Sequence, residues 1–368
     1  MYNILKLNKI AAIGTDRLGE NYNCVDECDA PEGILVRSAS MHDMELPESL
    51  LAVARAGAGV NNIPLDKCAE LGICVFNTPG ANANAVKELV ICGMLLASRK
   101  VAQGIAWNKT LADDAGCLKT VEKGKSQFVG PEIMGKTLGV VGLGAIGILV
   151  ANAAVALGMK VVGYDPFLSE AGKAKLADGI EVVDTLDGIY EASDYITLHL
   201  PLNDATRGTV NAETIAKMKD GVRVLNFARD GLVVSSDIIA ALESGKMAAY
   251  VTDFATNDLL TVDGVVAIPH LGASTPESED NCAVMAADQI KDYLENGNIK
   301  NSVNFPNISK ERNGKRVTVF GKGIEAAVKA AAADAAVATR GDYTYAIIDG
   351  ADAETFKAID GVIRVREL

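Results

Sequence analysis

A glycine-rich turn between an apolar strand and an apolar helix constrains the fold of this chain more than any other feature. The stretch Thr137–Asp165 opens with a β-type run, carries glycines at Gly142, Gly144 and Gly147, and continues to Leu157 without another glycine or a proline. The first glycine permits a tight turn, the second lets the backbone approach a pyrophosphate, and the third lets the helix pack closely on the strand. The helix N-terminus offers unpaired N–H groups to the phosphates.

A carboxylate follows the second strand of this unit. Asp165 lies close to the spacing of about 20 residues at which an acid binds the adenosine ribose hydroxyls of a dinucleotide. Because a carboxylate there repels a 2′-phosphate, the sequence predicts NAD rather than NADP. A membrane-spanning helix is the alternative, since Leu138–Met159 carries no charged residue. A spanning helix explains neither the glycine spacing nor the acid after a second apolar strand.

Strands and helices alternate along much of the chain. Six parallel strands are expected at 138–141, 161–164, 195–199, 222–226, 248–252 and 265–268. Parallel strands with helical crossovers indicate a doubly wound α/β domain. Shorter runs at 34–36, 50–54 and 74–77 predict a smaller α/β domain before it. After it, strands at 316–320, 343–349 and 362–366 with helices at 325–336 and 353–359 predict a small α+β unit.

Polar residues that follow the predicted strands form the candidate site, because ligands of open α/β sheets bind at the carboxyl ends of strands. His270 follows the last strand, and an imidazole with a reference pKa of ~6.5 suits proton exchange near neutrality. Arg229 suits paired hydrogen bonds to the carboxylate of a 2-hydroxy acid, although a salt bridge with Asp230 is the alternative. His199, before Pro201, is expected to form a wall of the nicotinamide pocket.

A carboxylate beside His270 would orient the imidazole and stabilise its charged form. Three aspartates near the fifth strand are candidates, and the residues alone do not choose between Asp253, Asp258 and Asp263. With a dinucleotide bound, hydride transfer is the expected chemistry.

Composition narrows the class of partner. The net charge of −13 argues against nucleic acid but allows a small anionic substrate in a local cationic pocket. The seven cysteines are scattered without a C-x-x-C pair, which is typical of reduced thiols in the cytoplasm and predicts no metal site. The N-terminal apolar run is too short for a signal peptide, so a cytoplasmic protein without a membrane partner is expected.

At these residues the chain resembles the D-2-hydroxyacid dehydrogenase family, from about residue 10 to residue 306. The similar stretches are VRSAS at 36–40, RAGAGVNNI at 55–63, NTPGANANAVKELV at 77–90, GKTLGVVGLGAIG at 135–147, YDP at 164–166, LHLP at 198–201, NFARDGLV at 226–233, IPHLGAST at 268–275 and NSVNFP at 301–306. The resemblance implies a flavodoxin-like substrate domain made of residues 1–98 and 277–304, into which a Rossmann NAD domain of residues 99–276 is inserted.

The resemblance also implies roles for individual residues. Arg229 would anchor the substrate, His270 would be the acid/base, and Asp258 stands where the family has the glutamate that pairs with the histidine. The implied substrate-binding residues are Arg37, Ser38, Arg55, Gly57, Ala58 and Gly59, with the two arginines facing a phosphate. The cofactor-binding residues are expected to be Gly142, Gly144, Ala145, Ile146, Gly147, Asp165, His199, Pro201, Thr206, Phe227, Ala228, Asp253 and Gly272.

Two stretches point to the branch of the family that oxidises 3-phosphoglycerate to 3-phosphohydroxypyruvate for serine biosynthesis: NSVNFP, and VRSAS with RAG. An unphosphorylated acid such as lactate or glycerate is one alternative, and a nucleotide-sensing binding protein is another. Residues 305–368 resemble a shortened ACT regulatory domain. The loop Phe320–Glu325 has none of the His, Asn and Pro that bind an amino acid in that module, so a docking or dimerisation role is equally open. A homodimer or homotetramer is expected.

Overall fold

The computed structural model describes residues 1–368, which form two compact units. The first unit comprises Met1–Asn82 and Pro276–Leu368, and the second is Ala83–Thr275. The division falls after residue 82 rather than at the expected 98/99 boundary. The reason is that helix α3 (Ala83–Arg99) buries Val90 and Met94 in the core of the second unit, against helix α6 (Ala145–Ala156) and strand β11 (Met247–Thr252). The C-terminal segment groups with the first unit.

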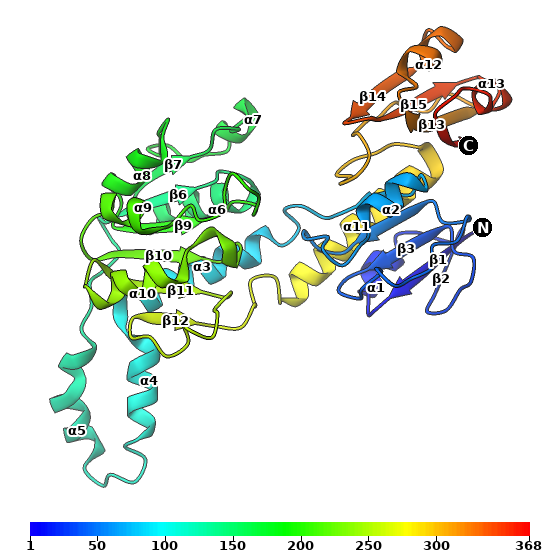
Figure 1. Ribbon diagram of the computed structural model, residues 1–368. Helices are drawn as coiled ribbons and strands as arrows, with labels where there is room; N and C mark the ends of the chain where they lie inside the picture. The colour runs from blue at the N-terminus through cyan, green and yellow to red at the C-terminus, as the bar shows by residue number, and fades with distance from the viewer. The chain divides into compact units, whose positions relative to one another are not determined.

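A parallel seven-stranded sheet forms the centre of the second unit, in the order β12-β11-β10-β9-β6-β7-β8 (Figure 1). Its strands are β6 (Thr137–Val141), β7 (Lys160–Tyr164), β8 (Glu181–Val182), β9 (Tyr195–Leu198), β10 (Val222–Asn226), β11 (Met247–Thr252) and β12 (Val265–Ala267). The doubly wound prediction is confirmed, and the six expected strands agree with the structure to within one residue at each end. The short exposed strand β8 was not predicted, because it has no apolar run.

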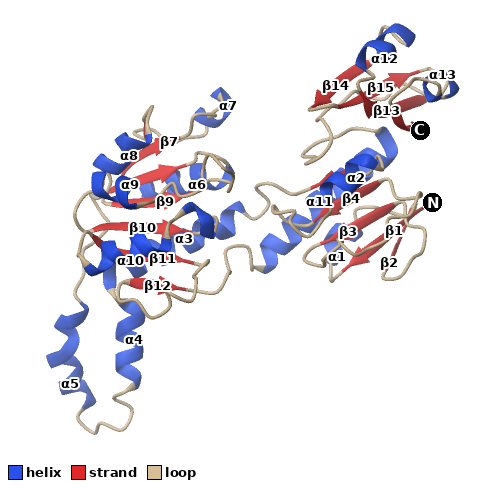
Figure 2. Cartoon of the chain, viewed as in Figure 1, coloured by secondary structure: helices blue, strands red, loops and turns tan.

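The helices of this unit lie on both faces of the sheet, as Figure 2 shows. They are α6 (Ala145–Ala156), α7 (Glu170–Lys173), α8 (Leu186–Ala192), α9 (Ala212–Lys217) and α10 (Ser235–Glu243), with a short 3₁₀ turn η2 (Asp230–Leu232). Strand β6 pairs with both β7 and β9, so the strand order reverses beside β6. In doubly wound sheets, ligands bind at this switch point, outside the carboxyl ends of the strands.

The uncharged stretch Leu138–Met159 is not one helix. It contains strand β6, the glycine turn and helix α6, and Leu138, Val140 and Ala151 are buried in the core of the unit. None of the helices is both long and apolar enough to cross a membrane alone. Helix α3 and the following helix α4 (Val101–Lys109) meet that test only as a pair, which is bent by 68°.

An arm formed by residues 101–128 extends away from the sheet of this unit (Figure 1). It consists of α4 (Val101–Lys109), α5 (Cys117–Gly124) and the 3₁₀ turn η1 (Lys125–Phe128). Trp107 and Phe128 hold its two sides together, with ring centroids 5.3 Å apart. No residue of α4 or α5 is buried, so the arm has no core of its own.

The first unit contains a parallel five-stranded sheet in the order β2-β1-β3-β4-β5, which is the flavodoxin-like order. Its strands are β1 (Tyr2–Leu7), β2 (Tyr22–Val25), β3 (Gly33–Val36), β4 (Ala52–Arg55) and β5 (Cys74–Phe76), with helices α1 (Ala12–Thr15) and α2 (Leu65–Glu70). Helix α11 (Pro276–Asn296) returns to this sheet and packs on α1 and β4, burying Ala283, Ala286 and Ile290.

The C-terminal segment folds as β-α-β-β-α-β, with an antiparallel sheet in the order β14-β15-β13-β16. This connectivity is that of ferredoxin-like domains. Its elements are β13 (Arg316–Lys322), α12 (Glu325–Ala331), β14 (Ala336–Arg340), β15 (Tyr343–Asp349), α13 (Glu354–Lys357) and β16 (Val362–Glu367). The helix expected over 325–336 ends at Ala331 instead, because Ala336–Arg340 pairs with β15.

Arginine side chains join this C-terminal domain to the rest of the first unit. Arg316 is fully buried, forms an ion pair with Asp349 and donates to the carbonyl oxygen of Asn296 at 2.7 Å. Arg366 donates to the carbonyl oxygen of Leu294 at 3.0 Å, so both guanidinium groups meet the C-terminal end of helix α11. Cations are favourable there because they satisfy the last carbonyl groups and oppose the helix dipole.

Candidate functional site

The glycine turn after β6 has the shape that a dinucleotide pyrophosphate needs. Gly142 has φ +94°, and a Cβ atom there would lie 2.6 Å from the His199 carbonyl oxygen. A Cβ atom on Gly147 would lie 1.9 Å from the Gly142 carbonyl oxygen, so the helix approaches the turn as closely as the sequence predicts. Gly144 precedes helix α6 and has open space where its Cβ atom would be. The turn therefore leaves room for phosphate against bare backbone at a helix N-terminus.

Asp165 lies at the end of β7 beside this turn. Its Oδ2 accepts a hydrogen bond from the Leu143 amide at 2.9 Å, and its Oδ1 accepts one from the Phe167 amide at 2.8 Å. These bonds fix the carboxylate beside the glycine turn, where ribose hydroxyls of a dinucleotide are bound. The residues present thus fit NAD at both the pyrophosphate and the adenosine ribose.

The ends of β9 and β10 supply the next residues. Burial lowers the pKa of His199 to about 4, and its Nε2 lies 3.1 Å from Thr197 Oγ1, so the ring is neutral at pH 7. Thr206 Oγ1 donates to the Pro201 carbonyl oxygen at 2.6 Å and shapes the turn after β9. A neutral, partly buried imidazole suits the wall of a nicotinamide pocket.

Asn226, which closes strand β10, was not singled out from the sequence. It is fully buried, and its Nδ2 donates to the Arg229 carbonyl oxygen at 2.8 Å. Its Oδ1 accepts from the amides of Ala228 and Arg229 at 3.2 and 3.3 Å. A polar residue closing an apolar strand is the signal that would have identified it, because a buried amide must find partners.

Arg229 and His270 lie against the same aromatic ring. The Phe254 and His270 ring centroids are 4.3 Å apart, and the Arg229 guanidinium carbon is 6.0 Å from the Phe254 centroid. The Arg229 Nη1 also donates to the Ala228 carbonyl oxygen at 2.6 Å. The structure therefore brings the predicted anchor and the predicted acid/base together, through a phenylalanine that the sequence did not indicate.

The aspartates differ in their surroundings. Asp253 is only 4% exposed; burial raises its pKa, while the charges of His270 and Arg229 and the Gly272 amide oppose that rise. The Asp258 carboxylate accepts a short hydrogen bond from Thr256, and no hydrogen bond or ion pair joins it to His270. Asp253 is thus the carboxylate whose charge couples to both predicted catalytic side chains, and the Asp258–His270 pair remains a prediction.

The predicted substrate-binding residues lie in the first unit, at the ends of β3 and β4. These strands are neighbours, with Val36 opposite Arg55, so Arg37 and Arg55 follow the same edge of the sheet. Arg37 forms an ion pair with Glu279 of α11 at 2.7 Å. The Arg55 guanidinium lies over Gly57, where a Cβ atom would be 2.1 Å from its Nη1. Two guanidinium groups at one sheet edge suit an anion.

The loops beside these arginines are held by side-chain amides. Asn8 Oδ1 accepts from the Ser38 amide at 3.1 Å, and Asn77 Nδ2 donates to the Ala58 carbonyl oxygen at 2.7 Å. The Ser38 amide is therefore already occupied by the fold. Neither asparagine was indicated by the sequence, since each acts across strands that are distant along the chain.

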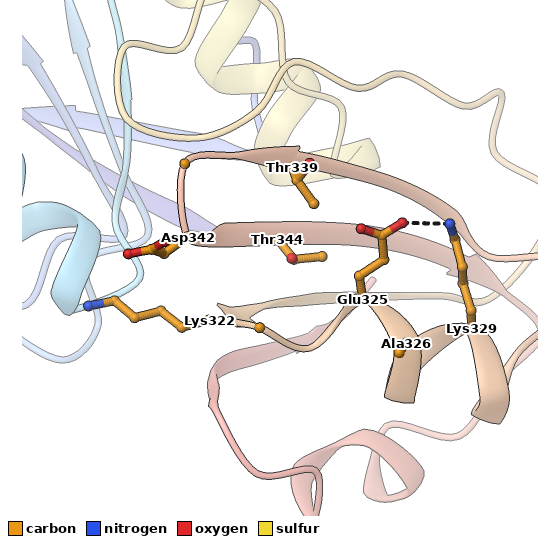
Figure 3. Close-up of a pocket in the computed structure, with 9 residues that line it drawn as sticks. Lys322, Glu325, Ala326, Lys329, Thr339, Asp342 and Thr344 are labelled. Atoms are coloured by element: carbon orange, nitrogen blue, oxygen red, sulfur yellow. Dashed lines mark hydrogen bonds and ion pairs between the residues drawn. The ribbon is translucent and has the colours of Figure 1, made fainter.

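The C-terminal domain carries a separate pocket of about 910 Å³ (Figure 3). Lys322, Glu325, Lys329 and Asp342 contribute the charged groups that line it. Lys329 and Glu325 form an ion pair at 2.6 Å on one side of helix α12. Of these four charged residues, Glu325 and Lys329 pair with each other, and Lys322 lies over the Tyr343 ring, with Nζ 4.9 Å from the ring centroid.

Comparison with known proteins agrees with this geometry. Residues 92–272 match the family described as D-isomer specific 2-hydroxyacid dehydrogenase, NAD binding domain. The chain is 39% identical over 278 residues to the D-3-phosphoglycerate dehydrogenase of Methanocaldococcus jannaschii, covering 74% of this chain and 51% of that protein. It is also 39% identical to the hydroxypyruvate reductase of Thermotoga maritima, covering 70% of this chain and 83% of that protein.

Solved structures show the same fold. The NAD⁺-bound 3-phosphoglycerate dehydrogenase of Entamoeba histolytica aligns with a TM-score of 0.62 at 26% identity, covering 82% of this chain and 98% of that one. A glyoxylate reductase from a Paecilomyces species aligns with a TM-score of 0.66 at 26% identity, with 82% and 98% covered. The chain spans about half the length of the phosphoglycerate dehydrogenases that it matches in sequence.

Proposed function

The chain belongs to the D-isomer specific 2-hydroxyacid dehydrogenase family, and we propose that it oxidises 3-phosphoglycerate with NAD to 3-phosphohydroxypyruvate. The observation that carries the choice of substrate is the pair Arg37 and Arg55 at adjacent strand ends. A phosphate group carries more charge than a hydroxyl and is bound well by guanidinium groups. An unphosphorylated acid offers these two guanidinium groups no second anionic group.

Residues of the second unit supply the groups that this oxidation needs. Bound NAD supplies the hydride acceptor. The glycine turn and Asp165 would hold it, with His199 and Asp253 toward the nicotinamide. Arg229 binds the substrate carboxylate and stabilises the carbonyl oxygen that forms at C2. His270 takes the proton of the C2 hydroxyl, so the proton and the hydride leave the substrate separately.

Initial rates of NADH formation test this proposal. We expect kcat/KM for 3-phosphoglycerate to exceed that for D-lactate and D-glycerate by ~100-fold or more, since two charge-assisted contacts are lost without the phosphate. Arg55→Ala should reduce the rate with 3-phosphoglycerate far more than the rate with D-glycerate. Equal losses for both acids would contradict phosphate recognition by Arg55.

Hydroxypyruvate reduction is the second candidate activity. It is favoured by the Thermotoga maritima relative, which this chain covers over 83% of its length. The assay is NADH consumption with hydroxypyruvate set beside 3-phosphohydroxypyruvate. Faster reduction of the unphosphorylated acid would replace the first proposal while leaving the roles of His270 and Arg229 unchanged.

For the C-terminal domain we propose an ACT-like fold that serves docking rather than amino-acid sensing. Supporting this, Arg316 and Arg366 bind it to helix α11, and two charged residues of its pocket, Glu325 and Lys329, pair with each other. Rates measured with and without L-serine test the idea. Unchanged rates agree with a docking role, and inhibition by serine would show that the pocket still binds an amino acid.

We further propose that the protein is a homodimer or homotetramer assembled through the arm. Its helices bury no residue of their own, and Ile105 and Leu118 are 54% and 80% exposed. Apolar side chains gathered on an extended arm are typical of a protein–protein contact.

A further inference from the structure

We propose that Phe254 is a positioning residue that holds His270 and Arg229 in their working geometry, in place of a hydrogen-bonded carboxylate. The inference deepens the proposed function, and its kinetic test rests on that function. It starts from the contacts of His270: its ring lies 4.3 Å from the Phe254 ring at a tilt of 48°, and no hydrogen bond or ion pair joins it to Asp258.

The Phe254 ring contacts both predicted catalytic side chains. Phe254 meets the imidazole at 4.3 Å and the Arg229 guanidinium carbon at 6.0 Å. Aromatic rings attract each other in offset or tilted arrangements, and cations are attracted to a ring face within about 6 Å of its centroid. One side chain therefore restrains both the group that binds the carboxylate and the group that moves the proton.

Hydrogen bonds fix the backbone that carries the Phe254 ring. The Phe254 amide donates to Thr252 Oγ1 at 3.0 Å, and Thr252 Oγ1 donates to the Asn226 carbonyl oxygen at 3.0 Å. Asn226 in turn donates to the Arg229 carbonyl oxygen at 2.8 Å. Thr252 and Asn226 are both fully buried. A continuous set of hydrogen bonds thus connects the backbone of Phe254 to that of Arg229 across the ends of β11 and β10.

The Asp258 carboxylate is hydrogen-bonded to Thr256 and not to His270. Asp258 accepts its short bond from Thr256, whose hydroxyl also lies 3.3 Å from Ser235 Oγ. That bond uses Oδ1 of Asp258, and no hydrogen bond joins Asp258 to His270. Phe254, by contrast, directly follows the buried Asp253 and contacts the imidazole as the chain is folded.

Three variants test the role. Phe254→Leu removes the ring while keeping an apolar side chain, and Phe254→Tyr keeps the ring. Phe356→Leu, a buried substitution in the C-terminal domain, controls for a general loss of stability. We expect Phe254→Leu to lower kcat by ~10- to 100-fold and to raise KM for the acid, because small displacements of catalytic groups are costly. Phe254→Tyr should stay within ~3-fold, and NADH affinity measured by fluorescence should be unchanged in both.

A second measurement does not depend on the substrate. The chain has three histidines, His42, His199 and His270, so the imidazole signals of histidine-labelled protein can be assigned one by one. We expect Phe254→Leu to shift the His270 ring signals, because the ring current of Phe254 is lost, and to leave the His42 signals in place. In the Phe254→Tyr variant the His270 signals should stay close to their wild-type positions. Unmoved His270 signals, or a Leu variant as active as the Tyr variant, would overturn the proposal. A wild-type protein that oxidises no hydroxy acid would overturn the proposed function alone, and the His270 signals would still show whether the Phe254 ring lies against His270.

Discussion

At the scale of single residues, the chain uses burial to set the charge of His199. The imidazole is neutral in the folded protein because desolvation lowers its pKa from 6.5 to about 4. In the unfolded chain the same ring is solvated and has the higher pKa. Between these two values the unfolded chain binds a proton that the folded chain does not, so folding stability falls as the pH falls from 6.5 toward 4.

His199→Gln should therefore flatten the pH dependence of stability. Between about pH 7 and about pH 4.5 we expect the wild type to lose ~2–3 kcal/mol through this residue, since one pKa unit is worth 1.36 kcal/mol. Urea unfolding at both pH values measures the difference. His42→Gln is the matched control, because His42 is exposed. A His199→Gln protein with the wild-type slope would contradict the assignment.

The ion pair between Arg37 and Glu279 leads to a prediction about substrate binding. The side chains are 39% and 42% exposed, and pairs of this kind contribute only about 0–1 kcal/mol to stability. Glu279→Gln should therefore leave the melting temperature unchanged while freeing Arg37 for an anion. We expect KM for 3-phosphoglycerate to fall by ~2- to 10-fold with little change for D-glycerate.

A matched control for that variant lies on the same helix. Asp288 forms a similarly exposed ion pair with Arg17 at 2.6 Å, and neither residue is a predicted substrate ligand. Asp288→Asn should leave both KM values as they are. If it lowers KM as much as Glu279→Gln does, the effect is one of net charge rather than of Arg37.

At the scale of elements, the C-terminal end of helix α11 joins the flavodoxin-like sheet to the C-terminal domain. Arg316 binds three main-chain carbonyl oxygens, those of Asn296, Lys310 and Glu311, at 2.7 to 2.9 Å. Its hydrogen bond also holds the pKa of the Asp349 carboxyl below the ordinary value. A fully buried guanidinium with this many partners is part of the fold and cannot be removed without leaving polar groups unpaired.

Arg316→Met should lower the free energy of unfolding by about 3 kcal/mol, because it removes the donors of three main-chain carbonyl groups and one of the two cations that pair with Asp349. Equilibrium urea unfolding is the measurement. Lys315→Met, which breaks an exposed pair with Glu367, should lower the free energy of unfolding far less. If the two variants lost similar amounts of unfolding free energy, burial would not be the reason that the Arg316–Asp349 pair stabilises the fold.

The elements also show how far the sequence could lead. Apolar runs and glycine punctuation located the strands of the large sheet, and with them His270 and Arg229 at the strand ends. Phe254, Thr252 and Asn226 escaped prediction because their contacts depend on which strands become neighbours, not on spacing along the chain. The alanine-rich helix expected over 325–336 ends at Ala331, and the following strand Ala336–Arg340, which pairs with β15, was not predicted. The compact units divide after residue 82 rather than at 98/99, because α3 buries Val90 and Met94 in the core of the second unit.

At the scale of the whole molecule, we predict that the arm forms the contact between subunits of the oligomer. Leu118→Glu or Ile105→Glu should shift the protein toward the monomer, because a charge would have to be buried in the contact. Sedimentation velocity measures the change. Leu260→Glu, at a side chain that is 59% exposed outside the arm, should leave the oligomer intact. An assembly that resists both arm variants would place its interface elsewhere.

The division of the chain into a continuous and a discontinuous unit has a consequence for its synthesis. Residues 83–275 are contiguous and can fold as soon as they leave the ribosome, whereas the sheet of residues 1–82 lacks α11 until the whole second unit has been made. At 5–20 residues per second, that interval is roughly 10 to 40 s. Throughout it, the early strands present the apolar face that α11 later covers, so the emerging N-terminal segment is the part of this protein that most needs a chaperone.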